Sequence, residues 1–511
     1  MNEKKYPGER LLRCIAPCYG IMMGLILFLC IFCTGDGYAC KRFCEYFLSP
    51  FLLLPAGVLL LWGLYRLCTR VFRRPRRHML LVFSVCLFLL QVFAVYSYYF
   101  RTGWDVQAIV SAAERAAHGS PPQNSVYFSR YPNNLFLTSL FSLFFRAVHL
   151  LGLHDHEYVL LLCGMCFLNM LSGALLALTV RELFHEPALT AFGWIVYVLL
   201  IGLSPWASIP YSDSCGLFIP ILTLYLYVKR DSFRFAGTFW LLAAALSWIG
   251  CKVKPQLIFA FVSVVIVALL SDGKGTEKRN IPLKAGCALL GLLLAVFAVR
   301  FSESTLNMTL LPDQSFGTAH YLMMGFNPET CGIYSSDDVA FSASFDTKEE
   351  RTAADLAEAK ERIRSMGVSG VLRQLKRKTL TNYTNGTFAW GVEGSFFLGA
   401  PERGSSPAAG FFRSLYYFPS WQEGSGSLYP LWANLMQMLW LSLLLLGMFS
   451  LRSGTASVLR ISMLSIMALS VFEAVFEARA RYLYVYAPVY VLIAVFSAAG
   501  ISRRKHECAA E

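Results

Sequence analysis

The sequence predicts an all-α polytopic membrane protein with about twelve transmembrane helices. Of its 511 residues, 56% are hydrophobic and only 15% are charged, whereas soluble domains carry about 25% charged residues. Apolar runs that meet or approach the roughly 20 residues needed to cross a bilayer recur along the whole chain. These runs cover residues 14–34, 47–66, 79–100, 157–180, 188–204, 213–229, 234–251, 254–271, 284–301, 428–450, 456–475 and 482–499. The expected environment is therefore a lipid bilayer.

The distribution of basic residues indicates the topology. The net charge is +13, but Lys and Arg concentrate in short loops, so membrane topology explains them and no nucleic acid is expected as a partner. With twelve spans, every basic cluster falls on one side of the membrane, which the positive-inside rule assigns to the cytoplasm. The clusters lie within residues 4–13, 66–78, 229–234, 274–284, 452–460 and 503–505. We therefore predict a multi-pass plasma-membrane protein with both termini in the cytoplasm.

One further apolar segment, residues 133–152, does not fit this count. If it crossed the membrane, every basic cluster after it would move to the opposite side. Arg146 and His149 interrupt its broad apolar face, a pattern typical of a helix that lies at the membrane surface. We predict that this helix lies on the outer surface or re-enters from it, and that the loop 101–156 is external.

The predicted spans divide the chain into four parts. Residues 1–78 hold two additional N-terminal spans, and residues 79–301 form the transmembrane core. Residues 302–427 form an external hydrophilic segment that is long enough for a small domain. Residues 428–511 hold the last spans and a cytoplasmic tail. We expect the external segment to be rich in α-helix, to pack over the external mouth of the core and to help bind an acceptor.

Two stretches of the external segment carry local predictions. Residues 347–380 are rich in Ala, Glu, Lys and Arg, and Glu358 precedes Arg362 by four residues, so this stretch is predicted to be helical. Gly367 and Gly370 are expected to break or kink that helix. The stretch "NYTNGTFAWG" at 382–391 has two open interpretations. It is either a loop whose aromatic and amide side chains contact a sugar, or an ordinary turn.

An acidic residue stands where the third predicted span ends. Trp104 and Asp105 follow its apolar run almost directly. Asp105 has two compatible interpretations: the N-cap of the helix that follows it, or a carboxylate placed at the membrane boundary for chemistry. The next loop carries Arg130, Tyr131 and Asn133. Its Pro and Asn residues predict a turn, but a turn does not account for the Arg and the aromatic residues around it.

Later junctions on the same predicted side carry further charged residues: Asp213, Lys252, Lys254, Glu477, Arg479 and Arg481. Asp213 opens a span, and it is interpreted either as a helix cap or as a site residue. Cations on a face that should be poor in positive charge indicate a bound anion. The alternative for the last three residues is interfacial anchoring by Arg and Tyr side chains.

Together these residues describe an external cavity with one well-placed carboxylate and several cations. A lipid-phosphate leaving group needs Arg or Lys to stabilise its developing charge, and an acceptor hydroxyl needs a base. Because phosphate leaves readily as an anion, no second carboxylic acid is required, in contrast to glycosidases. Asp105 is the candidate base. The candidate phosphate ligands are Arg130, Lys254 and Arg481, followed by Lys252 and Arg479, and the candidate supporting residues are Trp104, Tyr131, Asn133, Asp213 and Glu477.

These motifs resemble the GT-C superfamily of membrane glycosyltransferases. The most similar branch holds the protein O-mannosyltransferases of family 39 and the lipid A aminoarabinose transferases. That family places an acidic residue after its first core span, matched here by Asp105. Juxtamembrane helices follow in its large external loop, matched by residues 105–118 and 133–152. The resemblance covers roughly residues 79–300 and 428–499.

Three further motifs carry the resemblance. The family has a Pro-containing end of a span and an Asp that opens the next, matched by Pro205 and Asp213. It has a basic residue before Pro at a later external junction, matched by Lys254 and Pro255. Near the C-terminus it often shows an Arg–Tyr segment similar to "EARARYLYVYAP" at 477–488. The motifs occur in the same order as in the family, and all of them fall on the predicted external side. This agreement supports the resemblance.

The resemblance implies a GT-C-like fold, a polyprenyl-phosphate-linked sugar as donor, and inverting transfer to a hydroxyl of a cell-envelope acceptor in a bacterial plasma membrane. The acceptor is a glycan, a lipid or a protein. Many members carry two adjacent acids, whereas Trp104 and Val106 flank Asp105, which gives no support for a metal held by an acid pair. The 15 Cys residues show no zinc spacing, and no cofactor is expected. The alternatives are a lipid-linked oligosaccharide flippase or transporter, and a polysaccharide polymerase or ligase.

Overall fold

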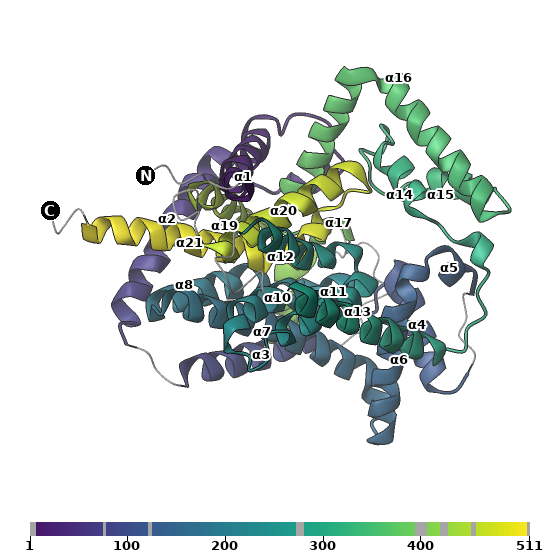
Figure 1. The fold of residues 1–511 in the computed structure, drawn as a ribbon, viewed down its shortest axis with the longest axis horizontal. Helices are drawn as coiled ribbons and strands as arrows, with labels where there is room; N and C mark the ends of the chain where they lie inside the picture. Colours follow the sequence, from purple (N-terminus) through teal and green to yellow (C-terminus); the bar gives the residue numbers. More distant parts are fainter. Residues whose placement is uncertain are drawn as a thin grey trace.

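A computed structural model shows how these segments are arranged. It describes residues 7–74, 78–120, 125–271, 281–393, 406–419, 428–450 and 456–507. The regular elements of this part of the chain are helices (Figure 1), which confirms the all-α prediction. Several residues of the predicted basic clusters, including Lys4, Lys5, Lys274 and Arg452, lie outside the described residues.

Eight helices of the described residues are long and apolar enough to cross a membrane. They are α1 (Pro7–Phe32), α2 (Pro50–Val71), α3 (Met79–Tyr98), α7 (Glu157–Phe184), α13 (Ile281–Ser304), α19 (Tyr429–Phe449), α20 (Ser457–Val475) and α21 (Ala487–Glu507) with its preceding turn η12 (Ala480–Tyr486). Four shorter apolar segments, at 187–202, 212–228, 238–253 and 255–270, coincide with the four remaining predicted runs. The structure thus supports a polytopic architecture, and the count of twelve crossings stays a prediction.

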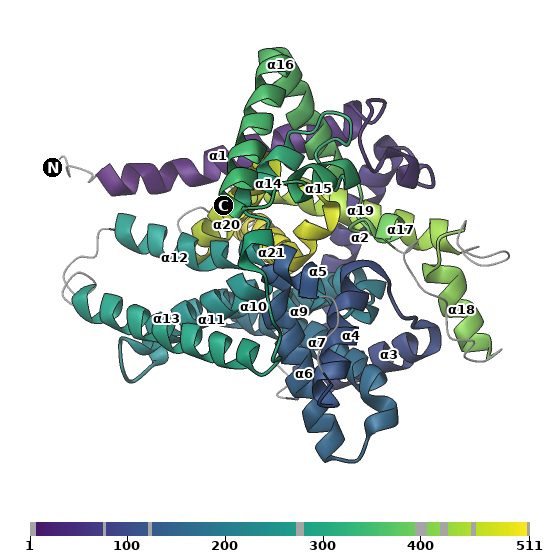
Figure 2. The ribbon, with the colours of Figure 1, turned by 90° about the vertical axis from the view of Figure 1, so that its right-hand side faces the viewer.

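The two N-terminal helices belong to the same helical body as the C-terminal ones. Helix α1 packs against α19 and α20, and α2 packs against α19 and α8 (Pro187–Tyr197). Buried apolar residues from α1 through α21 form one continuous hydrophobic cluster. The two helices that correspond to the additional spans predicted for residues 1–78 therefore pack directly against helices of the core. Figure 2 shows this packing in a view turned by 90°.

The shorter segments are interrupted helices, and their interruptions hold the polar residues of interest. Pro205 begins a turn of 3₁₀-helix, η5 (Pro205–Ser208), before α9 (Ser212–Gly216) and α10 (Phe218–Val228). Pro255 follows α11 (Thr238–Val253) and precedes α12 (Phe259–Leu270). Because proline disfavours helical geometry in the residue before it, Lys254 is extended, with φ −156° and ψ 122°.

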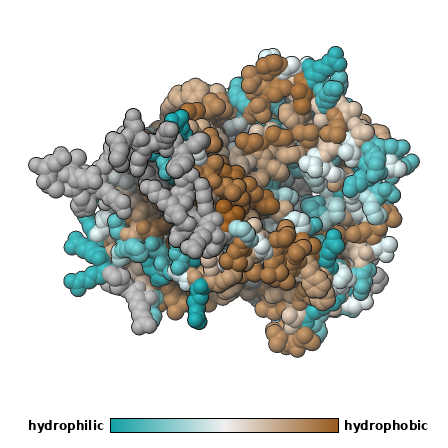
Figure 3. Space-filling view, viewed as in Figure 1, coloured by the Kyte–Doolittle hydropathy of each residue, from teal (hydrophilic) through white to brown (hydrophobic). Residues whose placement is uncertain are grey.

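Large apolar side chains are exposed along the outside of several long helices. Leu52, Leu59 and Trp62 of α2 are each more than half exposed, and Phe297 of α13 is 70% exposed. Figure 3 shows apolar side chains over the middle of one face, with hydrophilic side chains towards its edges. A continuous apolar surface of this kind is unfavourable in water, and it suits contact with lipid chains.

Three helices between α3 and α7 form the predicted loop region: α4 (Trp104–Ala117), α5 (Ser125–Arg130) and α6 (Leu135–Leu150). With 16 residues, α6 is about 24 Å long, shorter than the roughly 30 Å of a bilayer core. The Arg146 guanidinium donates to the carbonyls of Ala116 and Thr305, both at 3.0 Å. These bonds hold α6 against the ends of α4 and α13.

The short length of α6 leads to a topology prediction. If α6 does not cross, a cysteine introduced at Leu151, which is 74% exposed, should react with a membrane-impermeant maleimide in intact cells. The control is the unmodified protein, whose own exposed Cys14, Cys18 and Cys86 set the background. Labelling of Leu151→Cys only after permeabilisation would contradict the topology.

Residues 302–427, predicted to be external and called the external segment below, contain a helical arm that projects from the rest of the protein. Helices α14 (Thr318–Gly325) and α15 (Ser336–Ala343) pack against the long α16 (Lys348–Tyr383). The backbone of Gly367 is non-helical, with φ 58° and ψ −176°, which confirms the predicted kink. Figures 1 and 2 show the two limbs of α16 meeting at this bend.

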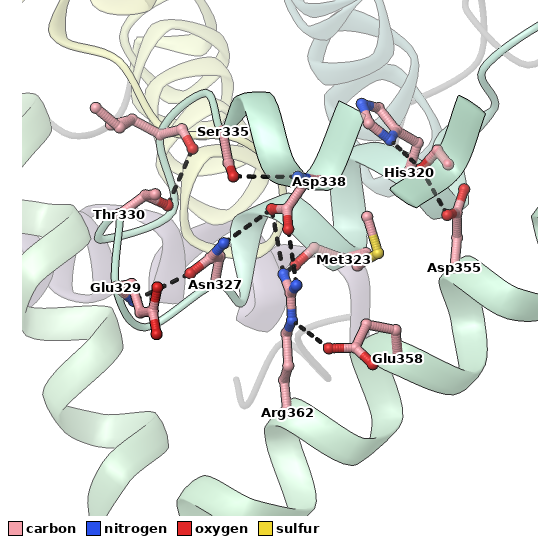
Figure 4. A network of polar contacts seen from close by, with 12 residues as sticks. His320, Met323, Asn327, Glu329, Thr330, Ser335, Asp338, Asp355, Glu358 and Arg362 are labelled. Atoms are coloured by element: carbon pink, nitrogen blue, oxygen red, sulfur yellow. Dashed lines mark hydrogen bonds and ion pairs between the residues drawn. The ribbon is translucent and has the colours of Figure 1, made fainter. Parts of the chain in front are cut away.

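A buried ionic network joins α15 to α16 (Figure 4). The Arg362 guanidinium donates to both carboxylate oxygens of Asp338, at 2.7 and 3.2 Å, and its Nε lies 2.9 Å from Glu358 Oε1. The contact between Glu358 and Arg362 confirms the predicted helical pair. Asp338 also accepts a hydrogen bond from the Asn327 amide at 3.0 Å. This network holds the first limb of α16 against α15.

His320 takes part in a second buried contact of the same segment. The Ser342 hydroxyl donates to Asp355 Oδ1 at 2.7 Å, so its oxygen accepts the N–H of His320 Nδ1, also at 2.7 Å. Burial lowers the pKa of His320 to about 4, because a charged ring is poorly solvated there. The ring is therefore neutral near neutral pH.

The depressed pKa of His320 predicts that acid destabilises the external segment. In the unfolded chain the ring binds a proton below about pH 6.5, whereas the folded protein binds it only near pH 4. Between these values the unfolded state holds more protons, so stability falls as the pH falls through this window. The melting temperature of His320→Gln should therefore drop less than that of the wild type in this range. The exposed His156→Gln is the control, and an unchanged pH response of His320→Gln would contradict the assignment.

The structure favours the second of the two interpretations of the stretch 382–391. Residues 386–389 form a turn, and the side chains of the stretch are not exposed as those of a sugar-contacting loop would be. Asn382, Thr384, Asn385 and Trp390 are each at most 3% exposed. The Gly386 N–H donates to the Gln437 side chain of α19 at 2.7 Å. The stretch returns the chain into the helical core, and its amide and aromatic groups are used in internal contacts.

Candidate functional site

Asp105 is held at the start of α4, but it does not cap that helix. The N-cap residue is Gly103, and Trp104 begins the helix with φ 47°. This left-handed conformation is unusual for an aromatic residue and costs roughly 1 kcal/mol or more. The Asp105 carboxylate accepts a hydrogen bond from the Tyr211 hydroxyl at 3.0 Å. The N-cap interpretation is therefore wrong, and the carboxylate is directed towards another chain segment.

Tyr211 lies in the interruption between η5 and α9, and only 7% of it is exposed. Burial raises the pKa of its hydroxyl well above the usual value, and the Asp105 carboxylate raises that pKa further. The hydroxyl therefore stays protonated and donates a hydrogen bond to Asp105. The Trp104 ring packs edge-on against the Tyr211 ring, with centroids 5.0 Å apart. These contacts set the orientation of the Asp105 side chain.

Asp213 lies two residues further along the chain and is 1% exposed. Its Oδ1 accepts a hydrogen bond from Lys254 Nζ at 2.6 Å, and its Oδ2 lies 4.0 Å from Arg481 Nε. The residue at the cap position of α9 is Tyr211. The cap interpretation of Asp213 is therefore wrong, and its charge is used to hold two cations.

Arg481 lies between Asp213 and the aromatic residues next to Asp105. It lies in η12, and its guanidinium carbon is 4.3 Å from the centre of the Trp104 ring and 5.2 Å from that of Tyr211. A cation over an aromatic face is attracted by the ring electrons. Lys254 makes a similar contact, with Nζ 4.0 Å from the centre of the Tyr482 ring. We refer to Trp104, Asp105, Tyr211, Asp213, Lys254, Arg481 and Tyr482 as the central cluster.

A group of tyrosines lies beside the central cluster. The Asn134 amide donates to the Tyr127 hydroxyl at 2.6 Å, and the Tyr127 and Tyr131 ring centroids are 5.2 Å apart. Burial raises the pKa of the Tyr127 hydroxyl, and the Asp105 carboxylate raises it further. Phe316, from the external segment, packs edge-on against Tyr131. The external segment thus reaches the neighbourhood of Asp105.

The remaining predicted residues have different surroundings. Arg479 and Glu477 form an ion pair, with 3.4 Å between Arg479 Nε and Glu477 Oε1. Lys252 Nζ lies 5.7 Å from the centre of the Trp248 ring in its own helix. Arg130 is half-buried, and its carbonyl accepts the Phe316 N–H at 2.9 Å.

Asn133 is exposed and donates to the side chain of its neighbour Asn134 at 3.3 Å. Among the predicted phosphate ligands, the structure thus brings Lys254 and Arg481 into the central cluster. The described contacts of Arg130 and Lys252 lie elsewhere.

Four residues of this region were not singled out from the sequence: Tyr127, Asn134, Tyr211 and Tyr482. The signal for Tyr211 was its place between a helix-breaking Pro210 and Asp213. Its partner Asp105 is 106 residues away in the chain, and no local pattern reveals such a pair.

The two carboxylates of the central cluster have different chemical capacities. Asp213 is buried between Lys254 and Arg481, so its charge is balanced and positions both cations. Asp105 is less buried, and its described hydrogen bond comes from a neutral hydroxyl. Asp105 can therefore accept a proton, while Lys254 and Arg481 can stabilise a nearby anion.

Comparison with known proteins gives a family. The profile of a family described as "conserved hypothetical integral membrane protein" matches residues 23–501, which includes every residue of the central cluster. No curated protein matches the sequence.

Proposed function

Within this family of conserved hypothetical integral membrane proteins, to which the chain belongs, we propose that the protein is a polyprenyl-phosphate-dependent glycosyltransferase. It transfers a sugar to a hydroxyl of a glycan, lipid or protein acceptor in the cell envelope, on the external face of a bacterial plasma membrane. The observation that carries this proposal is the central cluster itself. One accessible carboxylate and two oriented cations meet there, although they come from three separate chain segments.

The proposed reaction is a displacement at the anomeric carbon of the donor sugar. The bond between this carbon and the phosphate oxygen breaks, and its electrons leave with polyprenyl phosphate. The acceptor oxygen attacks from the opposite side and forms the new glycosidic bond, so the configuration inverts. The Asp105 carboxylate takes the hydroxyl proton as the new bond forms. Lys254 and Arg481 stabilise the departing phosphate.

The surroundings of the cluster support a lipid-linked donor. Exposed apolar helices place the protein in lipid, and the cluster lies at the interruptions of short apolar helices rather than on a hydrophilic domain. Lys254 and Arg481 can both donate hydrogen bonds to an anion, and the negative charge of Asp213 offsets the repulsion between their positive charges. Asp105, Asp213 and Lys254 of the cluster are also residues on which the sequence resemblance to the GT-C superfamily rests.

A flippase or transporter for lipid-linked oligosaccharides is the second candidate. The observation that favours it is the set of interrupted helices around Asp213 and Lys254, because transporters use such helices for substrate binding. A flippase moves its lipid without breaking the sugar–phosphate bond. The two functions therefore differ in whether the donor is consumed.

The test is a transfer assay with the full-length protein in proteoliposomes. A panel of radiolabelled polyprenyl-phosphate sugars is supplied with cell-envelope extract as acceptor. We expect one donor to be converted to polyprenyl phosphate with label in an acceptor fraction. Movement of intact donor across the vesicle membrane, without conversion, would support the flippase. Neither conversion nor movement of any donor in the panel would contradict both candidates.

A further inference from the structure

A cluster of imidazole and carboxylate groups lies at the end of α4 opposite to Asp105, where α6 ends and α7 begins. His118 directly follows α4, His149 is in the last turn of α6, and Glu157 is the first residue of α7. The ligand atoms that these three residues offer lie within 4.8 Å of one another. We propose that His118, His149 and Glu157 form a binding site for a divalent cation of the zinc type.

The carboxylate of Glu157 stands between the two rings. Its Oε2 is 2.6 Å from His149 Nε2, and its Oε1 is 3.7 Å from His118 Nε2. Ligand atoms of a tetrahedral zinc ion lie about 3.4 Å apart, given bonds of about 2.1 Å. The observed separations bracket this value, so small rotations of the side chains would complete the coordination.

The chemistry of the group favours zinc over magnesium or calcium. Two imidazoles and one carboxylate are a common donor set for zinc, with a fourth position left for water or another ligand. The His154 ring packs beside that of His149, with centroids 4.5 Å apart, but His154 is not one of the three residues whose ligand atoms converge. The rings of His118 and His149 are also 4.5 Å apart.

A hydrogen bond between His149 and Glu157 accounts for only part of this arrangement. Three of the eight histidines of the chain come together here from three different segments. The His149 and Glu157 side chains are 12% and 13% exposed, and that of His118 is 51% exposed. An ion could therefore enter from the aqueous side and become largely enclosed.

The location assigns a role to this ion. It would join the end of α4, the end of α6 and the start of α7, three elements that otherwise meet through side-chain packing and the Arg146 bonds. Since α4 begins at Trp104 and Asp105, fixing its other end restricts movement of the whole helix. The ion would be structural, and the inference does not depend on the proposed transfer reaction.

The test uses the full-length protein, purified in detergent with an affinity tag that contains no histidine. After incubation with zinc sulfate and extensive dialysis, metal content is measured by mass spectrometry. The melting temperature is measured with zinc and with EDTA. We expect one zinc per chain and a higher melting temperature with zinc than with EDTA. His118→Ala, at the exposed position, should fold normally and lose both the zinc and the thermal shift.

The matched control is His156→Ala. His156 is an exposed histidine directly before Glu157, and it is not a member of the cluster. This variant should keep the zinc and the shift. Replacement of zinc by cobalt should give a visible absorption spectrum of tetrahedral type in the wild type and in His156→Ala, but not in His149→Ala. Wild-type protein without retained zinc, or equal zinc content in the wild type and His118→Ala, would overturn the proposal. The cluster would then be a hydrogen-bonded His–Glu contact.

Discussion

Replacing Asp105 with Asn is expected to reduce sugar transfer by about 100-fold or more, while the protein remains folded and binds its donor. Asn has nearly the same size, and its amide oxygen can still accept the Tyr211 hydrogen bond that the carboxylate accepts at 3.0 Å. It cannot take a proton from an acceptor hydroxyl. The measurement is the single-turnover rate with saturating donor, together with donor affinity and melting temperature.

The control for Asp105→Asn is the same change at an exposed position of the external segment, Asp313. Asp313→Asn should leave the transfer rate, the donor affinity and the melting temperature unchanged. Near-normal turnover by Asp105→Asn would remove Asp105 from the reaction. Its hydrogen bond with Tyr211 would then serve only to hold α4 in place.

The ion pair between Lys254 and Asp213 gives the second large effect. Lys254→Met should lower the free energy of unfolding by roughly 3 kcal/mol, because both side chains are at most 6% exposed. The change leaves Asp213 with Arg481, whose Nε is 4.0 Å away, as its remaining cation. A double variant, Asp213→Asn with Lys254→Met, removes both charges of the pair and should recover part of this stability, since Arg481 then loses its contact with Asp213.

Donor use separates a structural role of this pair from a role in phosphate binding. If Lys254 binds the phosphate, the double variant should remain poor in donor use, with affinity reduced about tenfold or more. Lys252→Met is the control, because the described contact of Lys252 is with Trp248. Normal donor affinity in a stable double variant would limit Lys254 to a structural role. Equal stability of the single and double variants would contradict the ion-pair argument.

Structural features that depend only on neighbouring residues could be predicted from the sequence. The apolar runs correspond to the long and short helices, because length and hydropathy decide whether a segment can span a bilayer. The kink at Gly367 and the contact between Glu358 and Arg362 follow from glycine geometry and from helical periodicity. The order of the polar motifs also pointed to Asp105, Lys254 and Arg481, of which the last two meet at Asp213.

Features that depend on distant partners were not predictable. Asp105 and Asp213 both stand near helix starts, where capping is the common use of Asp, but each is engaged by residues far away in sequence. The stretch 382–391 has the composition of an exposed loop, yet the core satisfies its amides and aromatics. The cluster of His118, His149 and Glu157 was missed because its members come from three helices, so no ligand spacing appears in one segment.

A buried lysine helps to join the projecting arm to the segment that carries Arg481. Lys378, in the second limb of α16, is 0% exposed. Its Nζ donates to the carbonyl of Gly325 at 3.0 Å and to that of Phe476, next to Glu477, at 2.6 Å. A Cβ added at Gly325 would lie 2.5 Å from the Val475 carbonyl, so the two backbones are in contact.

This attachment connects the arm rigidly to the backbone next to the central cluster. The distance from the bend at Gly367 to Lys378 is 11 residues of helix, or about 16 Å. A load on the bend is therefore transmitted through a rigid rod to the backbone five residues before Arg481. A displacement of the bend would therefore also change the position of the backbone that leads to the Arg481 guanidinium.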